Sequence, residues 1–210
     1  MNFNEGLLRV SPLIVNLCEV ECSVLTMISR RRLFSVLVAC CLAFLSWLNC
    51  TPAATALGGQ LPPLNQPAPA FTLPTNTGKG LISLSDFKGT WVVLYFYPKD
   101  FTSGCTLEAR RFQQDLPKYL ARNAKILGVS ADDVDSHAEF CDSEGLKFPL
   151  LADTDGSVSK AYGSWLGYLS MRHTFIIDPN GILRERFVGV RPAIHSAEVL
   201  ARLDKLQASA

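Results

Sequence analysis

The chain has 210 residues, 48% of them hydrophobic, and a formal net charge of +1. This length and hydrophobic content allow one well-buried domain with an additional segment. Beyond residue 56 the chain carries sixteen basic and sixteen acidic residues. The body therefore has no basic surplus, and we expect no nucleic-acid partner.

The first 56 residues have the order of a secretory signal. Arg30, Arg31 and Arg32 precede sixteen uncharged residues, 33–48, and small and polar residues then end in Ala-Thr-Ala at 54–56. The apolar run is shorter than the roughly 20 residues of a spanning helix, which favours a signal cleaved after Ala56 over a retained membrane anchor. Counted from Met27 the signal has an ordinary length, so we expect Met27 to be the true start.

This segment predicts export from the cytoplasm, to a periplasm or a thylakoid lumen. Contact with a membrane is expected only if the segment is retained. Residues 57–69 are rich in Gly, Pro and Gln, which is typical of a linker or of an extended approach to a domain. The domain itself is expected over 70–210.

Strand-like and helix-like segments alternate through this domain. The expected strands are 70–73, 80–84, 91–97, 125–130, 148–152, 174–178 and 182–188, and the expected helices are 103–122, 133–144, 156–162 and 196–206. Residues 179–181, Pro-Asn-Gly, predict a hairpin turn. The pattern indicates an α/β fold with a mixed central sheet flanked by helices, in the order of the thioredoxin fold with an insertion between its halves.

The seven cysteines are unevenly distributed. Five precede Ala56, and only Cys105 and Cys141 lie in the body. Two cysteines in about 150 residues do not make a disulfide-stapled domain. The three histidines are scattered, and no Cys/His cluster has the spacing of zinc ligands. We therefore expect neither a metal nor another cofactor.

Cys105 lies in the first turn of the helix expected after strand 91–97, because Thr102 or Ser103 is placed to be its N-cap. Unpaired backbone N–H groups and the positive end of the helix dipole favour a thiolate there. A buried structural cysteine is the alternative. A Cys-x-x-Cys motif would indicate disulfide exchange, but the positions three residues away are Thr102 and Glu108.

The stretch Pro98-x-x-x-Thr102-x-x-Cys105 resembles the Pro-x-x-x-Thr/Ser-x-x-Cys signature of peroxiredoxins. Its surroundings, FYPKDFTSGCTLEA, are similar to the peroxiredoxin Q (bacterioferritin comigratory protein) branch. The likeness extends from about residue 69 to 206 and includes FPLLADTDG at 148–156 and RHTFIIDPNG at 172–181. The resemblance implies a thioredoxin-like fold and a thiol-dependent peroxidase that reduces hydrogen peroxide and organic hydroperoxides.

The resemblance also implies residue roles. Cys105 is the peroxidatic cysteine, which attacks peroxide and becomes a sulfenic acid. Thr102 hydrogen-bonds the thiolate and the peroxide oxygen, Pro98 shields the thiolate, and Arg172 stabilises the thiolate and orients the substrate. Without the resemblance, Arg172 is better explained as a solvated charge at a strand edge. Glu108 is either a partner for an arginine or an ordinary acidic residue of a first helical turn.

The chain departs from the branch at one position. The commonest arrangement has a resolving cysteine five residues after the first, where this chain has Arg110. Either an external thiol reduces a one-cysteine peroxidase, or Cys141 resolves Cys105 as an intramolecular disulfide that a thioredoxin-like reductant recycles. We favour Cys141, because Phe140 is the better core-facing residue of its helix and Cys141 is expected nearer the surface. An exposed, unused thiol is a liability in an oxidising compartment.

Two functions of other classes remain open from the residues. One is a redox-inert thioredoxin-fold binding module that docks partners around Phe101, and the other is disulfide exchange on exported proteins. Relatives in the branch are often monomers, so a monomer is expected.

Overall fold

The computed structural model of the protein describes residues 58–77 and 80–209. They belong to the second of two compact units, Thr55–Ala210. The expected signal over 1–56 lies outside the described residues. In the described part of the chain, no helix has the length and apolar character needed to cross a membrane.

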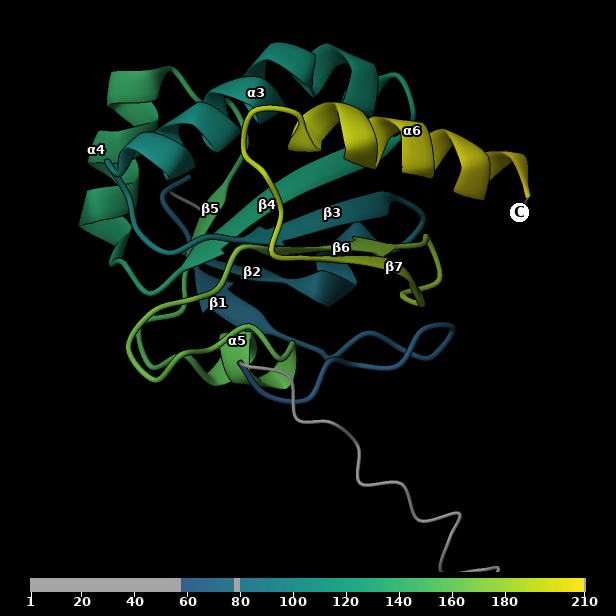
Figure 1. The fold of residues 1–210 in the computed structure, drawn as a ribbon, viewed down its shortest axis with the longest axis horizontal. Coiled ribbons are helices and arrows are strands. Elements are labelled where there is room, and N and C mark those ends of the chain that lie inside the picture. Colours follow the sequence, from purple (N-terminus) through teal and green to yellow (C-terminus); the bar gives the residue numbers. More distant parts are fainter. Residues whose placement is uncertain (1–57, 78–79, 210) are drawn as a thin grey trace, which may run out of the picture. The chain divides into compact units, whose positions relative to one another are not determined.

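A five-stranded mixed sheet forms the centre of the domain (Figure 1). Its strands, in spatial order, are β5 (Leu150–Ala152), β4 (Ala124–Ser130), β3 (Trp91–Phe96), β6 (His173–Ile177) and β7 (Leu183–Val188). Strand β3 is parallel to β4 and antiparallel to β6, and β4 is parallel to β5. The expected α/β fold with a mixed sheet is therefore confirmed.

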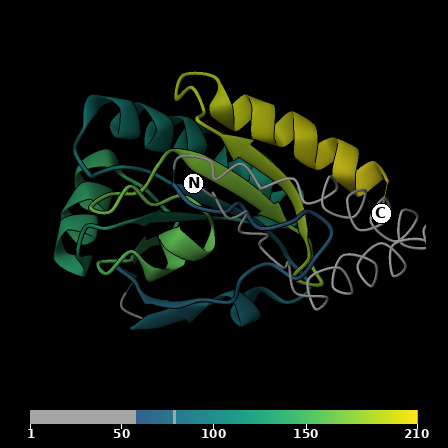
Figure 2. The same cartoon turned by 60° about the horizontal axis from the view of Figure 1, so that its bottom comes forward.

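Helices cover one face of the sheet and a hairpin with a short helix covers the other (Figures 1 and 2). The first face carries α3 (Ser103–Leu120), α4 (Val134–Glu144) and α6 (His195–Ala208). The second carries β1 (Thr72–Pro74), β2 (Leu81–Ser83), the 3-10 helix η1 (Leu84–Phe87) and α5 (Ser157–Ala161). Each predicted element overlaps one of these, and η1 was not predicted.

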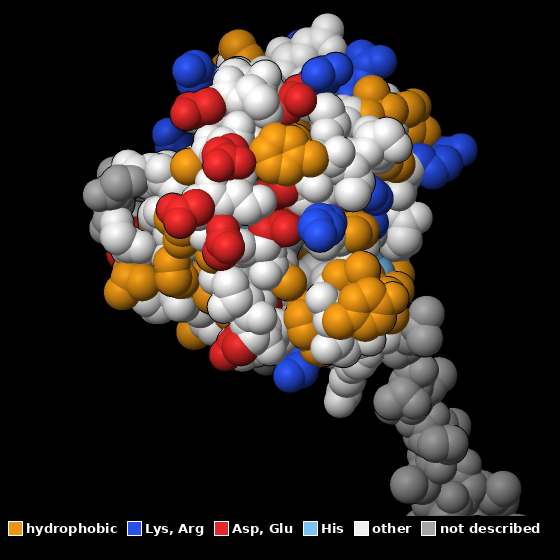
Figure 3. All heavy atoms as spheres, turned by 90° about the vertical axis from the view of Figure 1, so that its left-hand side faces the viewer, with side chains coloured by type: hydrophobic (Ala, Val, Ile, Leu, Met, Phe, Trp, Pro, Cys, Tyr) orange, Lys and Arg blue, Asp and Glu red, His pale blue; other side chains and the backbone are white. Residues whose placement is uncertain are grey.

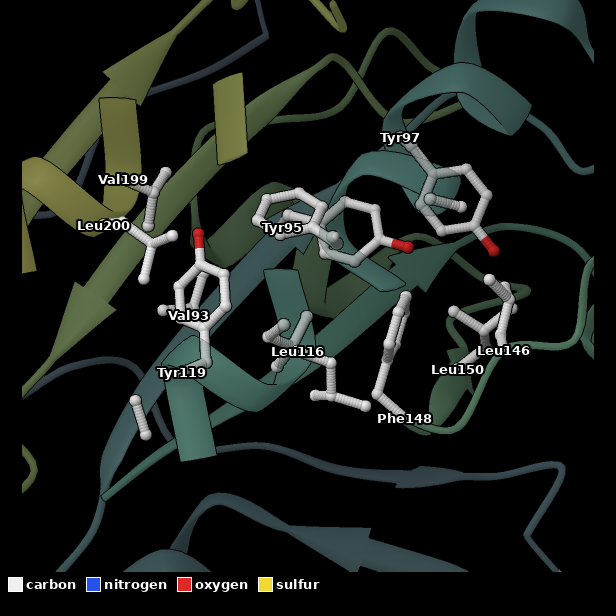
Figure 4. Packing of buried hydrophobic residues seen from close by; sticks show 14 of the residues in the cluster. Val93, Tyr95, Tyr97, Leu116, Tyr119, Leu146, Phe148, Leu150, Val199 and Leu200 are labelled. Atoms are coloured by element: carbon white, nitrogen blue, oxygen red, sulfur yellow. The ribbon is translucent and has the colours of Figure 1, made fainter. Parts of the chain in front are cut away.

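The central strand β3 is buried along its whole length and supplies both cores. Its alternate side chains point to opposite faces of the sheet. Trp91, Val93 and Tyr95 pack beneath the helices with Phe112 and Tyr119 of α3. Figure 4 shows Val93, Tyr95 and Tyr119 in this cluster. Val92, Leu94 and Phe96 pack on the opposite face with the hairpin and α5. A β-branched and aromatic run therefore forms the middle of the domain, as the sequence predicts.

The segment expected as a linker or an extended approach, 57–69, contacts the domain along its second half. The amide of Asn65 donates to the carbonyl of Leu183, and the amide of Ala68 donates to the carbonyl of Gly181. Leu61 and Leu64 pack against the core beneath the hairpin. The chain thus enters the domain along the start of β7.

Candidate active site

The loop between β3 and α3 places Cys105 at a helix start. Thr102 has extended backbone angles and is the N-cap of α3, and its carbonyl accepts the amide of Thr106. Cys105 is the third residue of the helix, among backbone N–H groups that have no intrahelical acceptor. Its thiol is free and only 1% exposed. The predicted position of Cys105 is therefore the observed one.

Sheet register brings Arg172 to Cys105, although 67 residues separate them. His173 of β6 pairs with Phe96, the last residue of β3, so Arg172 lies beside the loop that leads to α3. Its Nη2 donates to Cys105 Sγ over 3.3 Å. Gly104 permits this approach, because a Cβ atom at this position would lie 3.1 Å from Arg172 Nη2.

Glu108 completes a three-residue chain with Arg172 and Cys105. Arg172 Nη1 donates to Glu108 Oε2, so one guanidinium contacts the carboxylate and the sulfur at once. Burial raises the pKa of Glu108 to about 7, although the charge and hydrogen bond of Arg172 oppose the rise. Burial disfavours the charge of Arg172, but Glu108 and Cys105 outweigh it and raise the pKa of the guanidinium. Of the two readings of Glu108, the arginine partner is the observed one.

Thr102 and Pro98 lie near Cys105 in the chain but make other contacts. The Thr102 hydroxyl donates to the carbonyl of Lys99 over 2.9 Å, so its single proton is not directed at Cys105. Pro98 lines a surface pocket of about 360 Å³ together with Tyr168 and Leu169. The roles of Thr102 toward peroxide and of Pro98 as a shield stay predictions.

Cys141 is more buried than its sequence position suggests. Phe140 is fully buried, as expected for the core-facing residue, but Cys141 is only 6% exposed and is not the exposed thiol that was expected. The expected exposure was wrong because Cys141 shares the core-facing side of α4 with His137 and Phe140. Phe140 packs on Phe101, while Cys141 joins Leu146 and Phe148 in the core. Burial raises the pKa of the Cys141 thiol to about 11.

A buried carboxylate beside the site was not predicted. Asp100 is 2% exposed, and its carboxylate accepts hydrogen bonds from Tyr97, Ser136 and His137. The only sequence signal was an acidic residue between a buried strand and the cysteine. Its partners on α4 could not be foreseen, because they lie more than thirty residues along the chain.

The chain matches the AhpC/TSA family over residues 64–186. Peroxiredoxin Bcp of Xanthomonas campestris is 39% identical over 150 residues, which cover 67% of this chain and 93% of that protein. The chain belongs to this family. It is a peroxiredoxin of the Bcp and peroxiredoxin Q type, and thus a thiol-dependent peroxidase.

Two further comparisons agree. The chloroplastic peroxiredoxin Q of Oryza sativa subsp. japonica is 39% identical over 143 residues, covering 66% of this peroxiredoxin and 65% of the plant protein. The Xanthomonas campestris bacterioferritin comigratory protein, solved in trapped intermediate and ligand complexes that address its alkyl peroxide reduction, superposes with a TM-score of 0.61. It is 36% identical, with 64% of this chain and 90% of that chain covered.

The raised pKa of Glu108 predicts a pH-dependent stability of this peroxiredoxin. A carboxyl whose pKa rises from its ordinary 4.5 to about 7 on folding contributes stability below pH 4.5 that is lost as the pH rises through 7. Glu108→Gln removes this loss. The unfolding free energy of the variant relative to the wild type should therefore increase by roughly 2–3 kcal/mol between pH 4.5 and 8.

Denaturant unfolding at a series of pH values measures this difference. Glu139→Gln, at an exposed position of α4, is the control and should show no such trend. A Glu108→Gln difference that is constant with pH would mean that the buried carboxyl titrates in its ordinary range.

Proposed function

We propose that Cys105 is the peroxidatic cysteine and that it reduces both hydrogen peroxide and organic hydroperoxides. The thiolate attacks the terminal peroxide oxygen, so that an S–O bond forms and the O–O bond breaks. The leaving alkoxide or hydroxide takes a proton and departs as alcohol or water. Sulfur is oxidised by two electrons to a sulfenic acid. The related Xanthomonas protein, described for alkyl peroxide reduction, supports the organic substrate class.

The observation that carries this proposal is the contact between Arg172 Nη2 and Cys105 Sγ at the start of α3. A fixed cation and unpaired N–H groups stabilise negative charge on sulfur before the reaction. The same donors stabilise the charge that develops on the leaving oxygen. Because Glu108 fixes the guanidinium, this stabilisation needs little rearrangement during the reaction.

We further propose that Cys141 resolves the sulfenic acid. The Cys141 thiolate attacks the Cys105 sulfur, an S–S bond forms, and the S–O bond breaks. The hydroxide that leaves takes a proton and becomes water. A thioredoxin-like dithiol then reduces the disulfide to the two free thiols by thiol–disulfide exchange. Cys105 and Cys141 are the free cysteines of the described residues, and the helices that carry them, α3 and α4, contact each other, which supports this pairing.

Cys141→Ser tests the resolving step. After one equivalent of hydrogen peroxide, the wild type should yield a Cys105–Cys141 peptide in non-reducing peptide mapping. The variant should react with the first equivalent at a similar rate but keep Cys105 as sulfenic acid. Its turnover with a thioredoxin-like dithiol should fall by at least about tenfold, since the normal disulfide substrate of the reductant is absent.

The other readings give different results in this experiment. A persistent sulfenic acid in the wild type, or a disulfide only between chains, would indicate a one-cysteine peroxidase served by an external thiol. A redox-inert binding module would consume no peroxide. A disulfide exchanger would act on protein disulfides without peroxide.

We also propose that residues 1–56 direct export, with Met27 as the true start, and that the mature protein is a monomer. The order of charged, apolar and small residues supports the export signal. N-terminal sequencing of the natural mature protein tests the cleavage after Ala56, and the intact mass of an uncleaved precursor tests the start at Met27. Light scattering of the mature protein tests the monomer.

A further inference from the structure

A buried polar cluster joins the Cys105 loop to the helix that carries Cys141. The Tyr97 hydroxyl donates to Asp100 Oδ1 over 2.7 Å. From α4, the Ser136 hydroxyl and His137 Nδ1 each lie 2.8 Å from Asp100 Oδ2. Because a carboxylate only accepts, His137 must carry its proton on Nδ1 to donate this bond.

The cluster holds a charge in the protein interior. Burial alone would raise the pKa of Asp100, but the hydrogen bond and charge of His137, with the hydrogen bonds of Tyr97 and Ser136, outweigh burial and lower the pKa. The carboxylate is therefore ionised at neutral pH, and its stability depends on these donors. A buried carboxylate that loses a donor is strongly disfavoured. The bonds from Ser136 and His137 therefore resist separation of the loop from α4, and the Tyr97 bond keeps the carboxylate facing them.

Two other contacts hold the Cys105 loop in the same place. The Asp100 amide donates to Asp132 Oδ2 over 2.9 Å, and the Phe101 ring packs edge-on against Phe140 with 5.1 Å between centroids. Phe101 has a positive φ of 58°, a strained backbone conformation for an aromatic residue. This strain favours release of the loop, and the Asp100 contacts oppose it.

Helix α4 contacts the rest of the domain through the side that carries His137, Phe140 and Cys141. Its outer surface is acidic, as Figure 3 shows for the face of the domain on which α4 lies. The exposed acidic residues there are Asp133, Asp135, Glu139 and Asp142. On the inner side, His137, Phe140 and Cys141 are buried. The polar cluster and the ring contact between Phe101 and Phe140 are therefore the contacts that join this helix to the loop.

The resolving step requires that the Cys105 loop and helix α4 separate. Both thiols are free and almost fully buried, so a macromolecular dithiol cannot reach a disulfide between them in the closed fold. With a pKa of about 11, closed-state Cys141 is almost entirely protonated at neutral pH. Exposure would return its pKa to the ordinary range near 8.5 and increase the thiolate population.

We propose that Asp100 and His137 are positioning residues whose hydrogen-bonded contact keeps the Cys105 loop on α4 and limits how fast oxidised Cys105 reaches Cys141. This proposal rests on the two-cysteine cycle above. Neither residue is hydrogen-bonded to Cys105, so we assign both an action through the position of the loop and not through the peroxide reaction.

Tyr97→Phe and Tyr119→Phe form a matched pair for the test. Each removes one buried hydroxyl: that of Tyr97 donates to Asp100 over 2.7 Å, and that of Tyr119 donates to the Ser196 carbonyl over 2.8 Å. Figure 4 shows the two rings at opposite ends of the packed cluster. Only the first variant removes a donor to Asp100, and so destabilises the ionised carboxylate that Ser136 and His137 of α4 bind.

Rapid acid quench and thiol alkylation after one equivalent of hydrogen peroxide give the rate of disulfide formation. We expect Tyr97→Phe to raise this rate by about two- to tenfold, the range that one hydrogen bond supports. Amide hydrogen exchange over residues 99–106 should accelerate by a similar factor. Tyr119→Phe should change neither rate.

Two substitutions of His137 provide a second test. His137→Leu removes the donor to Asp100 and should raise both rates, whereas the amide of His137→Asn can donate in place of Nδ1 and should restore values near the wild type. Equal effects of Tyr97→Phe and Tyr119→Phe, or unchanged rates in Tyr97→Phe and His137→Leu, would overturn the proposal.

A failure of the two-cysteine cycle can be distinguished from this result. If the wild type forms no Cys105–Cys141 disulfide, the resolving role of Cys141 is wrong. Amide exchange then tests whether Asp100 and His137 restrain the Cys105 loop. Selective acceleration of exchange in Tyr97→Phe supports this role, and unchanged exchange overturns it too.

Discussion

Cys105→Ser is expected to lose peroxidase activity by at least about a thousandfold, because it replaces the nucleophile itself. A serine hydroxyl remains protonated at neutral pH and does not take up an oxygen atom as sulfur does. The substitution is nearly isosteric at a fully buried position in the first turn of α3. The fold should therefore be retained while the chemistry is lost.

The rate of the reaction with the first equivalent of hydrogen peroxide measures this loss, and Cys141→Ser provides the matched control. The control also replaces a buried cysteine by serine, but it should retain the first reaction with peroxide. Equal retention of that first reaction in Cys105→Ser would remove Cys105 from the peroxidatic role. Circular dichroism of both variants establishes that the helices remain.

The fold could be predicted from the sequence because its signals are local. The β-branched and aromatic run before Cys105 can only form a buried strand, and it is the fully buried β3. The helix start after it follows from N-cap residues at 102 and 103, and Thr102 is the N-cap. Both features depend on neighbouring residues, which a single sequence displays directly.

The site was less predictable because its contacts are distant in sequence. Arg172 reaches Cys105 through the register of β6 on β3, and only the family resemblance indicated it beforehand. The burial of Cys141 depends on how the inner face of α4 packs in the core with residues such as Leu146 and Phe148. The Asp100–His137 contact spans 37 residues, and neither residue belongs to the signature that marked the site.

Arg172→Ala should lower the rate constant for peroxide reduction by about 100- to 1000-fold, the loss typical of a deleted charge-stabilising donor. The guanidinium contacts Cys105 Sγ and Glu108 Oε2 together, so its removal deprives the sulfur of its cation and leaves a buried carboxyl without its partner. Arg172→Lys should also lose activity, since one ammonium cannot reproduce the planar fork that holds both groups.

Stopped-flow kinetics with hydrogen peroxide measures these rate constants, with Arg184→Ala as the control. Arg184 forms a comparable pair with buried Asp178, over 2.8 Å, where β6 and β7 meet, and its loss should leave the rate unchanged. A combined Arg172→Ala and Glu108→Gln variant separates the two causes of the loss. If the uncompensated carboxyl were responsible, the double variant would recover most of the activity. If the cation acts directly on the sulfur and the peroxide, as the 3.3 Å contact indicates, the double variant should stay as slow as Arg172→Ala.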